Sequence, residues 1–486
     1  MTRGRDAICL VKERLRDERG RIERDTPNRV ALAYPSPYRA AMSSLGYQTI
    51  YRLIQHSGEF SAARVFAPDR GLRWGHGAPE VSYETGQSLS AFGLIAFSIS
   101  YELELGPLLG MLHRAGVGVQ RAIRGQSDPL VIVGGPLTLS NPAIVEPYAD
   151  AIVVGEADAL VTDLLVHSFS HPVRHKRLEA LASLPSVWVP SLHGNKVPAA
   201  ARSDESLLPA WGPIRTPHTE LRDMFLIEAV RGCSRRCNYC VMRGRRGQGM
   251  RIIAAQKILD LIPEQAHRVG LVGAAVSDHP NIVDIVNSLA ERGCRVGLSS
   301  LRPERLNRRF VQALRAGGYR TVTTAMDGAS QRLRTQIERK TTADHLFAAT
   351  TACREAKVER LKLYLMVGLP GETLEDLNEC AELIRALSKI LPISIGVSAF
   401  CAKKGTPLQG ASFAGTDVID RHIKHLRRRI AGRADIKATS ARWAWVEHVL
   451  AGGGSAEGRA VLDAEQAGGT FAHYRKAFEA LGYKPR

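Results

Sequence analysis

The fold and the chemistry of this chain are both indicated by the stretch MFLIEAVRGCSRRCNYC, residues 224–240. Its first seven residues are apolar apart from one glutamate, which predicts a short buried β-strand. Cys233, Cys237 and Cys240 follow directly, so three of the chain's eight cysteines lie within eight positions. The sequence therefore predicts three thiols grouped at the carboxyl end of a strand.

The C-x3-C-x2-C spacing of these cysteines indicates an iron–sulfur site. Three thiolates on one loop can hold three irons of a [4Fe–4S] cluster and leave the fourth iron without a protein ligand. A structural zinc ion needs four ligands, and no nearby cysteine or histidine completes such a set. A thioredoxin-like C-x-x-C does not need a third cysteine. Seven arginines and no acid lie from Arg231 to Arg251. We interpret them as countercharges for an anionic cluster, as partners of a substrate carboxylate or phosphate, or as a solvated loop.

Length and composition are those of a globular protein with two or three domains. The chain has 486 residues, of which 44% are hydrophobic and 23% charged. No apolar run approaches the roughly 18 residues of a membrane span, and the first residues lack a signal-peptide core. We therefore expect a cytoplasmic protein without a membrane span. The net charge of +18 favours an anionic partner, or it is a solvated basic surface.

Two series of alternating strands and helices divide the chain. The runs RVALAYPSPY, GLIAFSISY, LVIVGGP and AIVVGEAD predict buried parallel strands of an open α/β sheet. A second series, from MFLIEAV to LPISIGVSAF, gives six strand–helix units and predicts a partial parallel barrel with its active site at the carboxyl ends of the strands. The helices of this series are expected over 254–268, 281–292, 304–316, 330–338, 343–356 and 373–389. The expected regions are an extension (1–27), a Rossmann-like domain (28–165), a linker (166–220), a partial (β/α)6 barrel (221–415) and a helical C-terminal region (416–486).

These motifs together resemble the radical S-adenosylmethionine (SAM) superfamily. Tyr239 precedes the last cysteine, and the segments LSSLRPERL, AMDGASQRLRTQIERKTT, LKLYLMVGLPGETLEDL and VSAFCAKKGTPLQ follow in the order typical of one branch. Members of that branch carry a cobalamin-binding-like domain before the barrel. The resemblance implies that Cys233, Cys237 and Cys240 bind a [4Fe–4S] cluster. It also implies that SAM binds the open iron and is reductively cleaved to a 5′-deoxyadenosyl radical.

The resemblance also implies SAM-binding residues at the strand ends. We expect Tyr239 beside the cluster, and Ser299 and Arg302 near the methionine amino-carboxylate of SAM. Asp327 stands where the branch more often has glutamate, and it is expected to accept the ribose hydroxyls. The turn with Gly368, Gly371 and Glu372 is expected to approach the adenosine. The second strand ends in GAAVSDHP rather than a Gly-Gly-Glu motif, and Ser277 or Asp278 is expected to hold the amine instead.

The N-terminal domain raises the question of cobalamin. By resemblance, Gly134, Gly135, Gly155 and Glu156 at two strand ends would approach the corrin or its nucleotide loop. The Asp-x-His-x-x-Gly motif that supplies a histidine ligand to cobalt does not occur before residue 165. The corresponding loop would place Met42, Ser43 or Leu45 near the lower face of the cobalt. The alternative is a domain of the same fold that binds no cobalamin.

Three functions follow from this resemblance. The first is a cobalamin-dependent radical SAM methyltransferase or related modifier of an unactivated C–H bond, which acts on a small molecule and is reduced by a flavodoxin or ferredoxin. The second is a radical SAM enzyme that acts on RNA like the methylthiotransferases. The basic segment from Arg421 to Arg433 favours this alternative. The third is a non-catalytic iron–sulfur or corrin-binding regulator. The sequence does not name the substrate.

Overall fold

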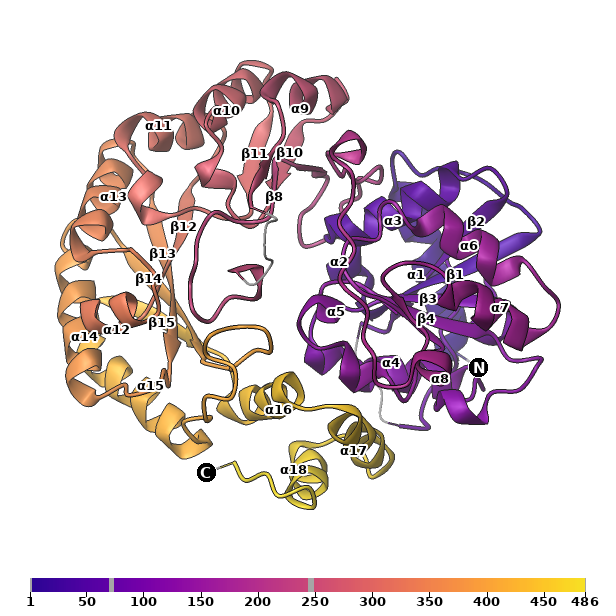
Figure 1. Ribbon diagram of the computed structural model, residues 1–486. Helices are drawn as coiled ribbons and strands as arrows, with labels where there is room; N and C mark the ends of the chain where they lie inside the picture. The colour runs from indigo at the N-terminus through magenta and orange to yellow at the C-terminus, as the bar shows by residue number, and fades with distance from the viewer. Residues whose placement is uncertain (1, 70–73, 244–248, 486) are drawn as a thin grey trace. The chain divides into compact units, whose positions relative to one another are not determined.

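A computed structural model describes residues 2–69, 74–243 and 249–485 of the chain. The chain divides into two compact units. Unit 1 comprises Met1–Asp223 and Val449–Lys484, and unit 2 comprises Met224–His448 and Pro485–Arg486. Both units combine parallel strands with helices (Figure 1). The predicted α/β class is therefore confirmed.

Unit 1 contains a six-stranded sheet in the order β2-β1-β3-β4-β5-β6. Strands β1 to β5 pair in parallel, and β6 joins β5 in the antiparallel direction. Helices cover both faces (Figure 1), which is why the strands are continuous apolar runs. In this order β1 and β3 flank the switch point, where ligands bind in such sheets. The strands are β1 (Asn28–Pro37), β2 (Phe60–Ala67), β3 (Leu94–Ser98), β4 (Leu130–Gly134), β5 (Ala151–Val153) and β6 (Val187–Trp188).

The helices of unit 1 come from both ends of the chain. The N-terminal helices are α1 (Thr2–Asp17), α2 (Tyr38–Ala41), α3 (Leu45–His56), α4 (Leu105–Arg114), α5 (Leu137–Ser140), α6 (Val161–Phe169), α7 (Arg174–Ala182) and α8 (Pro190–His193). The C-terminal helices are α17 (Ser455–Gln466) and α18 (Phe471–Glu479). Helix α17 packs so closely that a Cβ added at Gly458 would lie 2.2 Å from the carbonyl oxygen of Ile144. Tyr148 donates a hydrogen bond of 2.8 Å to the carbonyl oxygen of Gly458.

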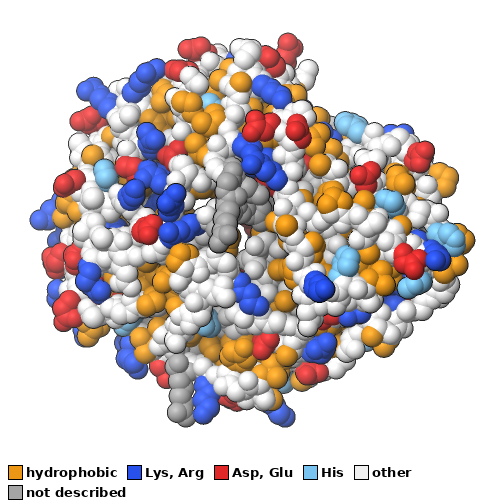
Figure 2. Space-filling model, in the orientation of Figure 1, with side chains coloured by type: hydrophobic (Ala, Val, Ile, Leu, Met, Phe, Trp, Pro, Cys, Tyr) orange, Lys and Arg blue, Asp and Glu red, His pale blue; other side chains and the backbone are white. Residues whose placement is uncertain are grey.

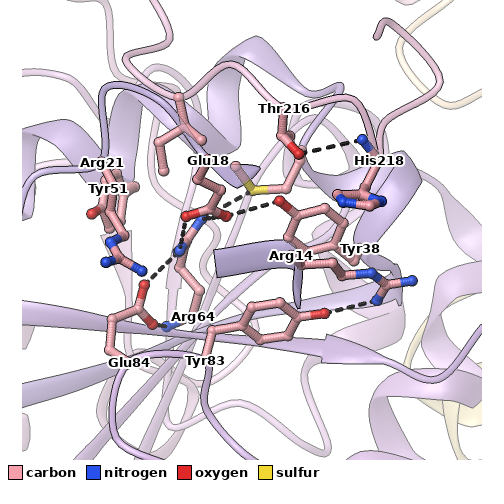
Figure 3. A network of polar contacts seen from close by, with 12 residues as sticks. Arg14, Glu18, Arg21, Tyr38, Tyr51, Arg64, Tyr83, Glu84, Thr216 and His218 are labelled. Carbon is pink, nitrogen blue, oxygen red and sulfur yellow. Dashed lines mark hydrogen bonds and ion pairs between the residues drawn. The ribbon is translucent and has the colours of Figure 1, made fainter. Parts of the chain in front are cut away.

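A buried ion-pair network joins the first residues of the chain to the sheet of unit 1. Arg64, on β2, is fully buried and pairs with Glu18 at 2.8 Å and with Glu84 at 2.6 Å (Figure 3). Tyr38 donates a hydrogen bond of 2.8 Å to Glu18, and the Arg64 guanidinium lies 5.1 Å from the centre of the Tyr51 ring. A buried charge is tolerated only when it is paired and hydrogen-bonded. The residues predicted as an extension therefore contribute to the interior of unit 1.

Unit 2 has its longer strands in an arc with helices on the outside (Figure 1). Two parallel sheets form the arc, β11-β10-β7 and β12-β13-β14-β15, and β8 and β9 form a separate antiparallel pair. The strands are β7 (Phe225–Glu228), β8 (Val230–Arg231), β9 (Arg251–Ile252), β10 (Arg268–Val272), β11 (Arg295–Leu298), β12 (Thr321–Asp327), β13 (Arg360–Val367), β14 (Ile393–Ala399) and β15 (Ala434–Ala438). The helices are α9 (Ala255–Leu261), α10 (Ile282–Glu291), α11 (Arg308–Ala316), α12 (Gln331–Gln336), α13 (Ala343–Glu355), α14 (Leu374–Ser388) and α15 (Thr416–Ile430), and α16 (Ala441–Gly452) contributes to both units.

The structure departs from the sequence predictions in three elements. Helix α9 ends at Leu261, although the periodic pattern predicted a helix over 254–268. The region 416–486 was predicted to be helical, but β15 pairs in parallel with β14. Within 166–220, α7 and β6 complete the sheet layers of unit 1. Short elements such as these depend on tertiary pairing rather than on a periodic pattern. Among the described residues, no helix is both long enough and apolar enough to span a membrane.

Candidate functional site

The three cysteines lie on a loop that begins after β7 and is closed at its base by a short hairpin. Strands β8 and β9 place Arg231 opposite Arg251. Gly232 has a φ of +84°, and a Cβ added there would lie 2.4 Å from the carbonyl oxygen of Gly249. Only glycine combines this positive φ with so close a backbone approach. The hairpin therefore holds the cysteine loop at the carboxyl end of β7, as the sequence predicted.

The three thiols fit a cluster better than a single metal ion. A single structural zinc ion takes four protein ligands, whereas this loop offers three thiols. A [4Fe–4S] cluster instead binds each thiolate on a different iron. Cys237 is 7% exposed, and Cys233 and Cys240 are half-buried. Burial raises the pKa of the Cys240 thiol, so binding a metal there must release its proton.

Hydrogen bonds and ion pairs hold the cysteine loop against neighbouring segments of unit 2. The backbone N–H of Asn238 donates to the carbonyl oxygen of Ile337 at 3.0 Å, and its side-chain amide donates to that of Gln336 at 2.9 Å. Arg235 pairs with Glu304 at 3.0 Å. These contacts fix the loop on both sides of Cys237.

Several of the clustered arginines have acidic partners, which gives them a structural role. The pairs are Arg231 with Glu228 at 2.6 Å, Arg235 with Glu304, and Arg243 with Glu338 at 3.6 Å. Arg245 and Arg246 lie outside the described residues. Basic side chains also lie side by side on unit 2, left of centre in Figure 2. The loop arginines therefore neutralise glutamates and position the loop, in addition to any effect on a cluster.

Tyr239, beside the last cysteine, belongs to a buried triad. Its hydroxyl donates a hydrogen bond of 2.8 Å to Asp327, whose carboxylate also pairs with Arg339 at 2.7 Å. Burial and the adjacent Asp327 charge raise the pKa of Tyr239, so the phenol stays protonated and donates. Asp327 ends β12 with a φ of +61°. Its carboxylate is directed to Tyr239 and Arg339, and its predicted contact with the ribose stays a prediction. Arg339 lies in the quoted segment AMDGASQRLRTQIERKTT, but its pairing with Asp327 follows only from the fold.

The ends of β10 and β11 bring the predicted polar residues together. The Ser299 hydroxyl donates to the carbonyl oxygen of Gly273 at 2.8 Å, so it fastens one strand end to the other. The Ser277 hydroxyl accepts a hydrogen bond of 3.1 Å from the backbone N–H of Arg302. Asp278 pairs with Arg302 and with Arg305, both at 3.2 Å. Arg302 also reaches the Cys233 sulfur, with Nη2 at 3.1 Å. Its predicted contact with SAM stays a prediction.

Hydrogen bonds and close packing within unit 2 stabilise the turn after β13. Gly368 has a φ of +81°, and a Cβ there would lie 2.4 Å from the side chain of Ile419 on α15. The Glu372 carboxylate accepts a hydrogen bond of 2.6 Å from the N–H of Gly368 and lies 2.9 Å from His422. Gly371 has a φ of +73° and open space around it. Glu372 therefore stabilises the turn and its packing on α15, and the predicted approach of this turn to the adenosine stays a prediction.

The switch point of the N-terminal sheet is bridged by side chains of the protein itself. Tyr34, on β1, and Ser100, after β3, share a hydrogen bond of 2.6 Å. Ser36 donates to Glu104 at 2.8 Å, and the same carboxylate accepts from the N–H of Ser100 at 2.6 Å. Glu104 is 3% exposed, and burial raises its pKa. These hydrogen bonds tie the β1 loop to the β3 loop at the switch point, where ligands of such sheets bind.

The glycines predicted to face a corrin instead approach the chain's own backbone. A Cβ at Gly135 would lie 2.5 Å from the carbonyl oxygen of Ile99, and one at Gly155 would lie 2.4 Å from the backbone nitrogen of Ala201. Glu156 accepts a hydrogen bond of 2.9 Å from the N–H of Ser203. Gly134 pairs with Ser98 within the sheet. The backbone conformations of Gly135 and Gly155 therefore serve close packing within unit 1.

The residues predicted near the lower face of the cobalt also contact other residues of unit 1. Met42 is 2% exposed, and its sulfur lies 3.6 Å from the buried Arg64 guanidinium. The Ser43 hydroxyl donates to the carbonyl oxygen of Arg39 at 2.9 Å and accepts from the N–H of Leu221. Leu45 is buried at the start of α3. These three residues therefore have partners within unit 1, and their predicted contact with cobalamin stays a prediction.

Comparison with known proteins defines the class of protein that this fold and cysteine loop form. Residues 227–384 match the radical SAM superfamily, and residues 46–190 match a domain described as radical SAM proteins, N-terminal. The chain is therefore a radical SAM superfamily enzyme with this N-terminal domain. The predicted superfamily is confirmed, and the family implies an iron–sulfur cluster and SAM.

The individual relatives support the fold of the chain but do not define its reaction. The chain is 24% identical over 399 residues to the uncharacterized protein MJ0966 of Methanocaldococcus jannaschii, which covers 79% of this chain and 80% of that protein. It also resembles the cobalamin-dependent SAM radical enzyme OxsB. The TM-score is 0.51 for OxsB with aqua-cobalamin and SAM bound, and 0.53 for its apo form. Identity is 12%, and the match covers 84% of this chain but only 58% and 56% of the respective OxsB chains.

Proposed function

We propose that this enzyme holds a [4Fe–4S] cluster through Cys233, Cys237 and Cys240 and uses SAM to activate a C–H bond of an organic substrate. When bound, the cluster and SAM supply a 5′-deoxyadenosyl radical after one-electron reduction by a flavodoxin or ferredoxin. The observation that carries the proposal is the cysteine loop, closed by the β8–β9 hairpin at the carboxyl end of β7. Active sites of parallel barrels lie at that end of the strands.

The chain's own residues position the reacting groups. The Asn238 hydrogen bonds and the Tyr239–Asp327 contact hold the loop that carries the three thiols. Arg302 donates to the sulfur of Cys233. A preorganised site of this kind lowers the reorganisation needed when charge changes at the cluster. The cofactor carries the difficult chemistry, and the protein supplies orientation and electrostatics.

Anaerobic reconstitution tests this proposal. The protein is loaded with iron and sulfide, reduced, and supplied with SAM, and then iron, 5′-deoxyadenosine and methionine are measured. We expect about four irons per chain and formation of both products. Cys237→Ala should lose most of the iron and both products. Cys9→Ala removes an exposed thiol outside the loop and should match the wild type. Full iron content and turnover in Cys237→Ala would refute the proposal.

Methyl transfer through cobalamin, which the resemblance and the OxsB-like fold favour, lies outside this proposal. The residues that would receive the corrin are engaged by Ile99, Ala201 and Arg64 of the chain itself. We therefore expect hydroxocobalamin, added anaerobically during reconstitution, to be removed completely by gel filtration. A corrin spectrum retained at about one equivalent per chain would show that the N-terminal domain opens to admit it, and it would restore the methyltransferase hypothesis.

A further inference from the structure

The inner face of the strand arc in unit 2 is accessible along β13. Buried and partly exposed side chains alternate along this strand. The helices lie outside the arc (Figure 1), so the buried set faces the helices and the other set faces inward. The inward set is Arg360, Lys362, Tyr364 and Met366. A closed barrel fills its interior with packed apolar side chains, whereas these inward side chains keep surface that a ligand can contact.

Tyr364 places an exposed aromatic ring in the middle of this inner face. It is 46% exposed and stands between Ala325 on β12 and Gly396 on β14. A Cβ added at Gly396 would lie 2.8 Å from Cδ1 and Cε1 of the tyrosine ring, so the ring packs against the glycine backbone. These two small neighbours leave the ring uncovered, and an aromatic face of this kind packs well against a second planar group.

Two lysines give this inner face a positive charge. Lys362 Nζ lies 4.8 Å from the centre of the Tyr364 ring and donates a hydrogen bond of 3.1 Å to its hydroxyl. Lys437 is exposed on the same face of β15. Neither lysine has an acidic partner among the described residues, whereas Arg360 pairs with Asp435 at 3.1 Å. Uncompensated charge of one sign attracts a ligand of the opposite sign.

The inner face also leads towards the end of the barrel that carries the cysteine loop. Tyr364 precedes Val367, the last residue of β13, by three positions, which corresponds to about 10 Å along a strand. The cysteine loop follows β7, and the carboxyl ends of parallel strands lie at the same end of a barrel. A molecule about 10 Å long, bound at Lys362 and Tyr364, would therefore reach from the middle of the face to that end.

We propose that the inner face of β13 to β15 is the substrate-binding surface and that the substrate is a small organic anion. Its planar part packs on Tyr364, and Lys362 and Lys437 bind its carboxylate or phosphate. The inference rests on the proposed function and names the substrate class of that site. The two lysines hold one end of the molecule, so the C–H bond to be activated lies at the other end, towards the carboxyl ends of the strands. Anchoring of this kind positions the reacting bond before the radical forms.

Calorimetric titration of the reconstituted, SAM-loaded enzyme tests this inference with three probes. Benzoate and phenyl phosphate each carry a planar ring and an anionic group, and benzyl alcohol carries the ring without the charge. We expect saturable binding of an anion and about tenfold weaker binding of the alcohol. The anion that binds more tightly identifies carboxylate or phosphate as the group that the lysines recognise.

Substitutions on the inner face locate the binding. Lys362→Gln should weaken binding of the preferred anion about tenfold, and Lys362→Arg, which keeps the charge, should retain most of the affinity. Tyr364→Leu removes the ring and should weaken binding about fivefold. Lys257→Gln is the matched control, because Lys257 is an exposed lysine on helix α9. It should bind the anion as the wild type does.

Three results would overturn the inference. They are no binding of either anion to the iron-loaded wild type, equal binding of the alcohol and the anions, and wild-type affinity in both Lys362→Gln and Tyr364→Leu. If Tyr364→Leu fails to take up iron, the comparison of Lys362→Gln with Lys362→Arg decides by the same titration. A wild-type protein that takes up no iron or forms no 5′-deoxyadenosine would refute the proposed function instead.

Discussion

Asp327 gains its role from two residues that are distant in the sequence. The strand pattern placed it correctly at the end of β12, but its partners Tyr239 and Arg339 belong to the cysteine loop and to the segment after α12. Its φ of +61° is a conformation that aspartate and asparagine tolerate better than other non-glycine residues. Asparagine can therefore replace Asp327 without a change in the backbone.

Asp327→Asn should destabilise the enzyme and loosen the cysteine loop. The substitution leaves the Arg339 guanidinium, 10% exposed, without its carboxylate, and such a loss costs about 3 kcal/mol. We expect a lower free energy of unfolding in urea and a smaller iron content after reconstitution. An unchanged iron content would contradict the role of Asp327 in holding the loop.

Tyr239→Phe tests the Tyr239–Asp327 hydrogen bond separately from the Asp327–Arg339 ion pair. This variant removes only the phenol donor to Asp327 and keeps the Asp327–Arg339 pair. We expect a loss of about 1 kcal/mol in the urea unfolding measurement. A loss as large as that of Asp327→Asn would mean that the ion pair depends on the tyrosine.

At the scale of elements, helix α14 begins with a reciprocal cap. The Thr373 hydroxyl accepts from the N–H of Asp376, and the Asp376 carboxylate accepts from the N–H of Thr373. The same carboxylate accepts a hydrogen bond from Ser330 and pairs with Arg332. Burial alone would raise the pKa of Asp376, but these partners lower it from 3.8 to about 2. The cap is therefore strongest when Asp376 is ionised.

The Asp376 cap should make stability depend on acid pH. Because the pKa is lower in the folded state, the full contribution is present above pH 3.8 and is lost as the pH falls through 2. The difference corresponds to about 2 kcal/mol. Urea unfolding from pH 5 to pH 2 should show this loss in the wild type and not in Asp376→Asn. Asp284→Asn, at a mostly exposed position on α10, should retain it.

Helix α17 depends on a glycine at its closest contact. Gly458→Ala would place a methyl group 2.2 Å from the carbonyl oxygen of Ile144, and overpacking of this kind costs about 1–3 kcal/mol. We expect a lower thermal midpoint and faster hydrogen exchange in α17. Gly46→Ala, in α3 with open space around it, is the control and should be neutral or slightly stabilising. Equal effects of the two substitutions would contradict the close packing.

At the scale of the whole molecule, the two units contain different sets of functional and structural residues. The cysteine loop and the residues predicted for SAM belong to unit 2, whereas unit 1 holds the ion-pair network of Arg64 and the hydrogen bonds at the switch point. A ligand stabilises only the folded unit that it binds. Loading with iron, sulfide and SAM should therefore raise the stability of unit 2.

Hydrogen exchange with and without the cofactors measures this division. We expect increased protection in β7, β10, β11 and β12 on loading, and no change in β1 to β5. In calorimetry the transition of unit 2 should move to higher temperature while that of unit 1 stays in place. An equal shift of both units would show that they unfold as one cooperative body.

Much of the fold follows from local patterns. The apolar runs of β1, β3 and β4 are recognisable because strands buried by helices need little polar surface. The helices α10, α13 and α14 lie within one residue of their predicted ends at each terminus. The short strand β15 was missed because its pairing with β14, rather than its composition, makes it a strand.

The sequence by itself determined the three cysteines and the parallel α/β architecture, because spacing and periodicity are properties of neighbouring residues, and its motifs carried the resemblance to the radical SAM superfamily. Only the tertiary structure decided the partners of each polar group: Arg302 against Cys233, Asp327 against Tyr239 and Arg339, and Gly155 against Ala201. These contacts join residues far apart in the chain, and whether a polar side chain meets a ligand or its own protein depends on burial and distance, which no local pattern contains.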